Sequence, residues 1–150
     1  MLKIEIGDAF NAIMNRDVVF CHGVNCQGSF GSGVAGLVKK NYPLAALAYK
    51  QHFRRHGLRL GQVIVAPPDK TGQPTVCHLA TQEFYGRDGK QYASYDAIIV
   101  ALQQVVKQFP DKEIHMPAIG CGLGGLDQKR VIAIIESVCY NVNATLWLVE

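Results

Sequence analysis

The chain has 150 residues, of which 49% are hydrophobic, a length and composition that suit one compact domain. Its formal net charge of +3 is mild. The basic residues form no dense stripe among aromatics, so we expect a small anionic ligand rather than a nucleic acid. No apolar run approaches the roughly 20 residues that span a bilayer, and residues 1–10 do not resemble a signal peptide. These features predict a cytoplasmic protein without a membrane partner.

The cysteines give the same indication about the compartment. They are odd in number and widely spread, and no pair has C-x-x-C spacing, which predicts reduced thiols and no structural zinc. His52 and His56 are four residues apart and lack an evident third ligand, so we expect no metal site there either.

Strand-like and helix-like segments alternate along the chain. Short runs rich in β-branched and apolar residues predict strands over residues 2–6, 18–24, 62–66, 75–81, 113–119 and 144–149. Helices are predicted over residues 8–14, 33–41 and 43–56, from Tyr95 to Phe109, and after an Asp127 cap. This order predicts an α/β fold in which helices flank a mixed sheet of about six strands, forming one domain over residues 1–150.

Two glycine-rich segments follow predicted strands and precede predicted helices. They cover residues 22–35 and 117–126. Glycine lets a ligand approach the backbone, and a helix N-terminus offers unpaired N–H groups, so each segment suits an anion. Ligands bind at the carboxyl ends of strands in such sheets, and together the two segments predict a cradle for two phosphates. The alternative for either segment is an ordinary tight turn.

Two better-known phosphate sites are excluded by spacing. The chain has no G-x-x-x-x-G-K-[ST] sequence, and no G-x-G-x-x-G sequence with an acidic residue about 20 positions later. It is therefore neither a P-loop protein nor a dinucleotide-binding Rossmann domain.

Three motifs carry a resemblance to the macrodomain family that covers nearly the whole chain. They are the Gly7-Asp8 pair, H-x-x-N-C-x-G-S-x-G-x-G-x-A from His22, and M-P-x-I-G-C-G-L from Met116. The His22 motif and the following Tyr42-Pro43 are most similar to fungal-type ADP-ribose 1''-phosphate phosphatases. The second glycine segment is most similar to the terminal ADP-ribose glycohydrolase branch. The resemblance implies a three-layer α/β/α fold, no cofactor, and ADP-ribose or its 1''-phosphate as ligand.

The resemblance also implies roles for single residues. Asp8 would accept a hydrogen bond from the adenine amino group, Asn25 would hold the distal ribose, and the two glycine segments would wrap the diphosphate and distal ribose. The implied ligand-binding residues are Gly7, Asp8, Ala9, Asn25, Gly31, Ser32, Gly33, Val34, Thr81, Gln82, Phe84, Ile119, Gly120, Cys121, Gly122, Leu123 and Gly124.

The chain departs from the glycohydrolase branch at two positions that carry its chemistry. That branch uses a lysine after the fourth strand, which forms an adduct with the sugar, and an aspartate in the second glycine loop. Gln82 and Gly124 stand there in this chain, and neither can act as nucleophile, acid or base. Hydrolysis of a phosphate monoester requires instead hydrogen-bond donors that bind the phosphate, and a positioned water. His22 could protonate the leaving oxygen or orient that water, which makes His22 and Asn25 the candidate catalytic residues.

Two functions are therefore expected. The first is metal-independent hydrolysis of ADP-ribose 1''-phosphate to ADP-ribose and phosphate. The alternative is an ADP-ribose reader, or a deacylating or de-ADP-ribosylating macrodomain, whose partners would be ADP-ribosylated targets. Several residues also have simpler interpretations. Asp8 could cap the first helix, His22 could be a core histidine, and Cys26 and Cys121 could be ordinary thiols rather than nucleophiles.

Overall fold

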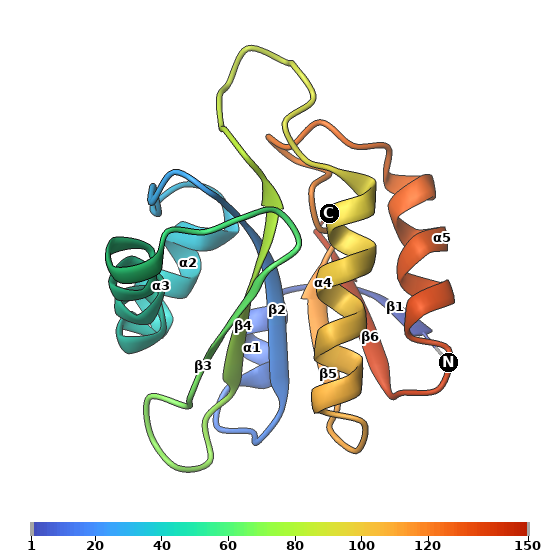
Figure 1. Ribbon diagram of the computed structural model, residues 1–150. Helices are drawn as coiled ribbons and strands as arrows, with labels where there is room; N and C mark the ends of the chain where they lie inside the picture. The colour runs from blue at the N-terminus through green and yellow to red at the C-terminus, as the bar shows by residue number, and fades with distance from the viewer. Residues whose placement is uncertain (1, 150) are drawn as a thin grey trace.

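The computed structural model describes residues 2–149, and its strands form a single six-stranded sheet (Figure 1). The strands are β1 (Leu2–Ile6), β2 (Val19–Asn25), β3 (Val63–Ala66), β4 (Thr75–Gln82), β5 (Ile114–Pro117) and β6 (Ala144–Leu148). The helices are α1 (Ala9–Ile13), α2 (Val34–Asn41), α3 (Pro43–His56), α4 (Tyr95–Gln108) and α5 (Gln128–Val138).

The strand order is β1-β6-β5-β2-β4-β3, and only β3 runs antiparallel to its neighbour. The carboxyl ends of β1, β6, β5, β2 and β4 therefore meet at one edge of the sheet, the upper edge in Figure 1. In the central pair, Phe20 lies beside Val76 and His22 beside His78. These strands are covered on both faces, which explains why they read as nearly continuous apolar runs.

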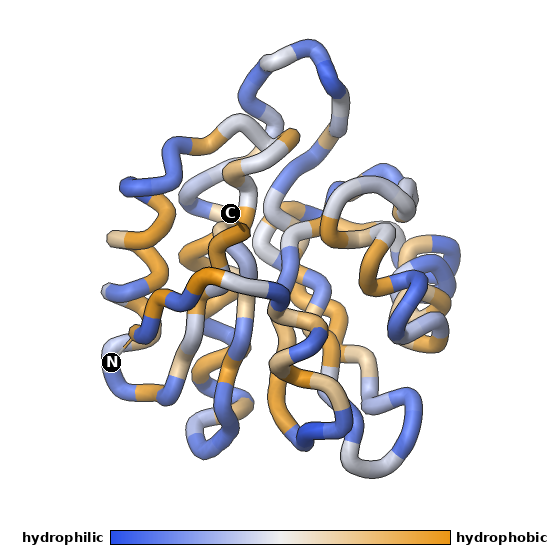
Figure 2. Tube along the Cα trace, turned by 180° about the vertical axis from the view of Figure 1, so that it is seen from behind, coloured by the Kyte–Doolittle hydropathy of each residue, from blue (hydrophilic) through white to orange (hydrophobic). Residues whose placement is uncertain are grey.

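Each face of the sheet has its own hydrophobic core, because alternate residues of a strand point to opposite faces. Cys21 and Val19 pack with α4 and α5, whereas Phe20 and Val24 pack with α1, α2 and α3. The outward sides of the helices carry hydrophilic residues (Figure 2). This arrangement confirms the three-layer α/β/α fold and the mixed sheet that the sequence predicts. No helix within residues 2–149 is long and apolar enough to cross a membrane.

No predicted boundary of a strand or helix differs from the observed one by more than two residues. The largest difference is at β5, which was expected over residues 113–119 and ends at Pro117. The chain turns there, since the amide of Cys121 bonds back to the carbonyl of Ala118. Asp8 and Asp127 cap α1 and α5 through their side chains. The capping interpretation of Asp8 is thus correct.

Candidate functional site

A cavity of about 670 Å³ opens at the edge where the parallel strands end, and both glycine loops line it. This volume lies within the usual range of small-molecule sites, roughly 300–1,000 Å³. The first loop contributes Ser29 and residues 31–35, and the second contributes residues 117–120 and 122–124. The predicted meeting of the two segments at one edge of the sheet is therefore correct.

Asn25 holds the first loop in shape. Its Oδ1 accepts hydrogen bonds from the amides of Gln27 and Ser29, and its Nδ2 donates to the carbonyl of Ser29 at 2.8 Å. The Tyr49 hydroxyl donates to the Asn25 carbonyl at 2.6 Å. Because an amide NH₂ carries two hydrogens, Asn25 keeps one N–H for a ligand while it braces the loop.

The first loop leads into α2 without closing the end of that helix. Gly33 is the N-cap residue, with φ of 59°, and it has no side chain to accept from the first turn. The amides of Gly33, Val34 and Ala35 have no hydrogen-bond partner among residues 2–149. A helix N-terminus with free N–H groups attracts negative charge, and here it lies on the wall of the cavity.

The second loop is compact because its glycines let backbone segments touch. A Cβ at Gly124 would lie 2.6 Å from the Gly120 oxygen, so no other residue fits there without movement. The Gly120 carbonyl accepts from the Leu126 amide at 2.9 Å, which fixes the turn. Within the described residues, the amides of Gly122, Leu123 and Gly124 have no partner. This loop therefore presents a second set of donors to the cavity.

His22 lies on β2 at the base of the cleft, and its side chain is fully buried against Phe20, Phe30 and His78. Its Nε2 is 2.7 Å from Nδ1 of His78, whose Nε2 is 2.8 Å from the carbonyl of Ala45. A carbonyl only accepts, so His78 carries its hydrogen on Nε2 and accepts from His22 through Nδ1. The His22 ring consequently has its lone pair on Nδ1, an atom without a partner in residues 2–149.

Both histidines are neutral at physiological pH. Burial, with the neighbouring His78 as a second cause, lowers the pKa of His22 well below its usual range. Burial lowers the pKa of His78 to about 4. His22 thus offers an acceptor at neutral pH rather than a proton, which favours orienting a water over protonating a leaving oxygen.

Thr81 supplies another unpaired polar atom on the opposite face of the sheet. Its hydroxyl is buried and has no partner within the described part of the chain. The residue lines the cavity beside Gly23, where a Cβ would collide with the Thr81 hydroxyl and come within 3.2 Å of Ile119. Gly23 therefore leaves the space in which the Thr81 hydroxyl lies at the cleft.

The structure brings most of the predicted site residues to this cavity. Those that line it are His22, Asn25, Gly31, Ser32, Gly33, Val34, Thr81, Gln82, Ile119, Gly120, Gly122, Leu123 and Gly124. Gly7, Asp8, Ala9, Phe84 and Cys121 do not line it.

The sequence interpretation missed the middle of the loop between β4 and α4. Tyr85, Gly86 and Arg87 line the cavity, and the Tyr85 side chain is exposed. No periodic pattern marks these residues. They follow closely after Gln82, which comes directly after the strand predicted over residues 75–81, and this position in the sequence was the available signal.

The two loop cysteines have little nucleophilic character. Burial raises the pKa of Cys26 to about 11 and that of Cys121 to about 11, so both are protonated at neutral pH. All five cysteines are free thiols. Within residues 2–149, no three His, Cys, Asp or Glu side chains are grouped so as to hold a metal.

Comparison with known proteins defines the class to which this fold and cleft belong. The family model described as Macro domain matches residues 21–135, and the chain belongs to that family. Among curated relatives, the ADP-ribose 1''-phosphate phosphatase of Meyerozyma guilliermondii is 24% identical over 156 residues, covering 87% of this chain and 89% of the relative. The DNA ADP-ribosyl glycohydrolase of Mycobacterium tuberculosis is 28% identical over 109 residues, covering 72% of this chain and 31% of that protein.

Solved structures give the same fold. The macrodomain of Mycobacterium tuberculosis DarG superposes with a TM-score of 0.81 at 23% identity, covering 98% of this chain and 97% of the other. Thermosipho africanus DarTG in complex with ADP-ribose has a TM-score of 0.80 at 19% identity, covering 99% of this chain and 42% of the other.

Proposed function

We propose that this macrodomain binds ADP-ribose in the cleft and hydrolyses ADP-ribose 1''-phosphate to ADP-ribose and inorganic phosphate. The observation that carries the proposal is the pair of unpaired amide sets, at Gly33 to Ala35 and at Gly122 to Gly124, on one cavity. Two such sets suit two phosphate groups. The phosphatase names of relatives aligned over most of the chain support the same substrate.

The reaction needs water and a way to orient it. The water oxygen bonds to phosphorus, the bond between phosphorus and the sugar oxygen breaks, and the sugar oxygen takes up a proton. We propose that His22 acts through a water held on its free Nδ1, and that Asn25 places the distal ribose with its remaining N–H. The ring is buried, so His22 reaches the substrate only by way of such a water.

The proposal includes neither metal nor cofactor, because main-chain donors meet the phosphate charge. It also places the protein in a reducing compartment such as the cytoplasm, where five free thiols persist. We further propose that residues 1–150 act as a single macrodomain.

A second candidate function is a module that binds ADP-ribose or ADP-ribosylated targets without hydrolysing the phosphate. One observation favours it: no carboxylate lines the cavity within the described residues, so direct acid or base help from an aspartate or glutamate is missing. The glycohydrolase name of one relative adds removal of ADP-ribose from DNA as a further form of this candidate.

Parallel assays separate the candidates. The protein is incubated with ADP-ribose 1''-phosphate, an ADP-ribosylated peptide and an ADP-ribosylated oligonucleotide, with and without a metal chelator. We expect phosphate release from the first substrate, unchanged by the chelator, and no ADP-ribose release from the others. His22→Ala should lower the rate of phosphate release roughly 100-fold or more and leave ADP-ribose affinity nearly unchanged. A folded His22→Ala variant with the parent rate would remove this residue from catalysis.

A further inference from the structure

The loop between β4 and α4 brings a single cation to the cleft. Of the described residues that line the cavity, Arg87 alone carries a full charge at neutral pH. Within residues 2–149 its guanidinium has no ion pair and no hydrogen-bond partner. Arg87 lines a cavity whose unpaired amides can donate hydrogen bonds to a phosphate. Because no other described residue pairs with its guanidinium, this charge is available to a ligand.

The base of this loop is tied to the second glycine loop. Gln82 forms an antiparallel bridge with Ala93, which closes the loop at its start and end. The amides of Tyr92 and Ala93 both donate to the carbonyl of Gly124, at 2.8 and 3.0 Å. The position of the loop relative to the anion-binding amides is therefore fixed by direct hydrogen bonds.

Tyr92 also holds the residues on both sides of Arg87. Its ring packs against Gly86, where a side chain would collide with it, and its hydroxyl donates to the Asp88 carboxylate, 2.8 and 2.9 Å from the two oxygens. The backbone at Arg87 is thus held from both sides, while its side chain is free. This arrangement lowers the entropy cost of presenting the guanidinium to a ligand.

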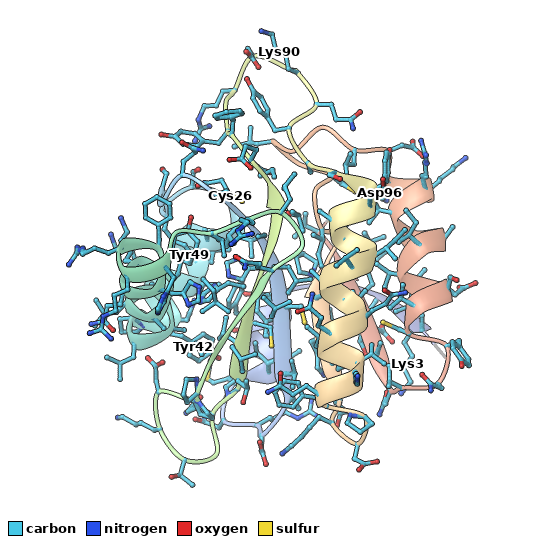
Figure 3. The ribbon with its side chains drawn as sticks, in the orientation of Figure 1. Lys3, Cys26, Tyr42, Tyr49, Lys90 and Asp96 are labelled. Atoms are coloured by element: carbon cyan, nitrogen blue, oxygen red, sulfur yellow. The ribbon has the colours of Figure 1, made fainter. Side chains whose placement is uncertain are left out.

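Among the ion pairs of residues 2–149, none joins Arg87 to Asp88, the acidic residue that follows it in the sequence. Asp88 is occupied by Tyr92 and by Lys90, whose Nζ lies 3.8 Å from a carboxylate oxygen, and it does not line the cavity. The hydrogen bond from Tyr92 lowers the pKa of Asp88. Figure 3 shows Lys90 at the apex of the loop, away from the glycine loops.

We propose that Arg87 forms a subsite for a terminal phosphate dianion beyond the diphosphate of the ligand, and so selects the 1''-phosphate over unmodified ADP-ribose. A guanidinium group binds a phosphate through two parallel N–H···O hydrogen bonds, whereas a hydroxyl at the same place cannot form this paired contact. The subsite rests on the proposed function for the identity of its ligand, and it adds the residue that distinguishes substrate from product.

The test compares two ligands that differ only in this phosphate. In Arg87→Gln, we expect KM for ADP-ribose 1''-phosphate to rise about tenfold or more, while Kd for ADP-ribose changes less than about twofold. Arg87→Lys should fall between parent and Arg87→Gln, because a point charge replaces the planar fork. Lys129→Gln is the charge control, since it removes one positive charge outside the cavity and outside this loop.

Salt gives a second readout. The parent KM for the 1''-phosphate should rise with ionic strength more steeply than that of Arg87→Gln, as expected when a cation contacts the ligand directly. Thermal unfolding of each variant checks that the loop change leaves the fold intact. Equal effects of Arg87→Gln on both ligands, or no effect on either, would overturn the subsite.

The subsite and the proposed reaction can fail separately. If the parent releases no phosphate, ADP-ribose 1''-phosphate becomes a stable ligand, and calorimetry with both ligands measures the same preference directly. A preference for the 1''-phosphate that Arg87→Gln abolishes would then support the subsite without the reaction. Phosphate release with an unchanged KM in Arg87→Gln would support the reaction without the subsite.

Discussion

Asp8 has two carboxylate oxygens, and the fold uses one of them. Its Oδ1 accepts from the Phe10 amide at 2.9 Å, which caps α1, and the side chain is otherwise exposed. The resemblance assigns the adenine amino group to this residue. Both roles fit one carboxylate, because the second oxygen remains available. The Asp8 carboxylate lies outside the lined cavity, at the end of β1, so an adenine there would extend the ligand along the sheet edge.

Replacing Asp8 separates its two roles. Asp8→Ala should lose the cap, at about 0.5–2 kcal/mol of stability, and should weaken ADP-ribose by about 1–3 kcal/mol. Asp8→Asn retains a capping oxygen, so it should keep the stability and still lose affinity as its NH₂ meets the adenine amino group. Calorimetry and urea unfolding measure the two effects, with ribose 5-phosphate as the ligand that lacks adenine. If Asp8→Asn binds ADP-ribose as the parent does, the residue is only a cap.

The two glycine loops differ in how much change they tolerate, even though both are rich in the same residue. At Gly122 a Cβ would meet no atom within 4 Å, whereas at Gly124 it would meet the Gly120 oxygen. Gly122 also lines the cavity, so a side chain there enters the space that a ligand would occupy. The fold requires a glycine at position 124, whereas Gly122 borders open space in the cavity.

Gly122→Glu is therefore expected to fold and to lose binding. The new carboxylate would oppose an anionic ligand sterically and electrostatically, and ADP-ribose should give no detectable heat at millimolar concentration. Gly124→Ala should instead lower the melting temperature, because its Cβ forces the loop to move. A folded Gly122→Glu protein with parent affinity would exclude the second loop from the site.

Elements with a repeating pattern were predictable from the sequence, and contacts between distant segments were not. The strands and helices follow from apolar periodicity and from local caps such as Asp127, which depend on neighbours a few residues away. The hydrogen bond between the His22 and His78 rings depends on the register of β2 against β4, and sequence patterns alone do not fix that register. Arg87 lies in a loop without periodicity, and its position depends on the contacts of Tyr92 and Gly124.

For the whole molecule, the buried histidine pair predicts how stability depends on pH. The folded pKa values of His22 and His78 lie below the unfolded value near 6.5, so the unfolded chain binds more protons in between. The stability from the neutral pair is fully present above about pH 6.5 and is lost progressively as pH falls toward 4. Each histidine adds a slope of up to about 1.4 kcal/mol per pH unit in this window.

Urea unfolding at pH 7, 6 and 5 measures this slope. His78→Gln removes one titrating ring and keeps an amide that can donate to the Ala45 carbonyl. It should be less stable than the parent at pH 7 and lose less stability between pH 7 and 5. A slope equal to that of the parent would mean that His78 does not titrate with unfolding.

The unpaired amides of Gly33 to Ala35 and of Gly122 to Gly124, which line this cleft, belong to the main chain, and this has a consequence for how the family diverges. A hydrogen-bond donor on a side chain is lost when that residue is substituted. The main-chain N–H of Gly122 or Val34 remains after substitution as long as the backbone conformation is unchanged. If the cleft binds an anion as proposed, this recognition would be inherited with the backbone, while the chemistry would change at a few side chains such as Gln82. Curated relatives that are 21–28% identical to this chain over the aligned residues carry names for two different reactions, as expected if a backbone cradle is kept while a few side chains change.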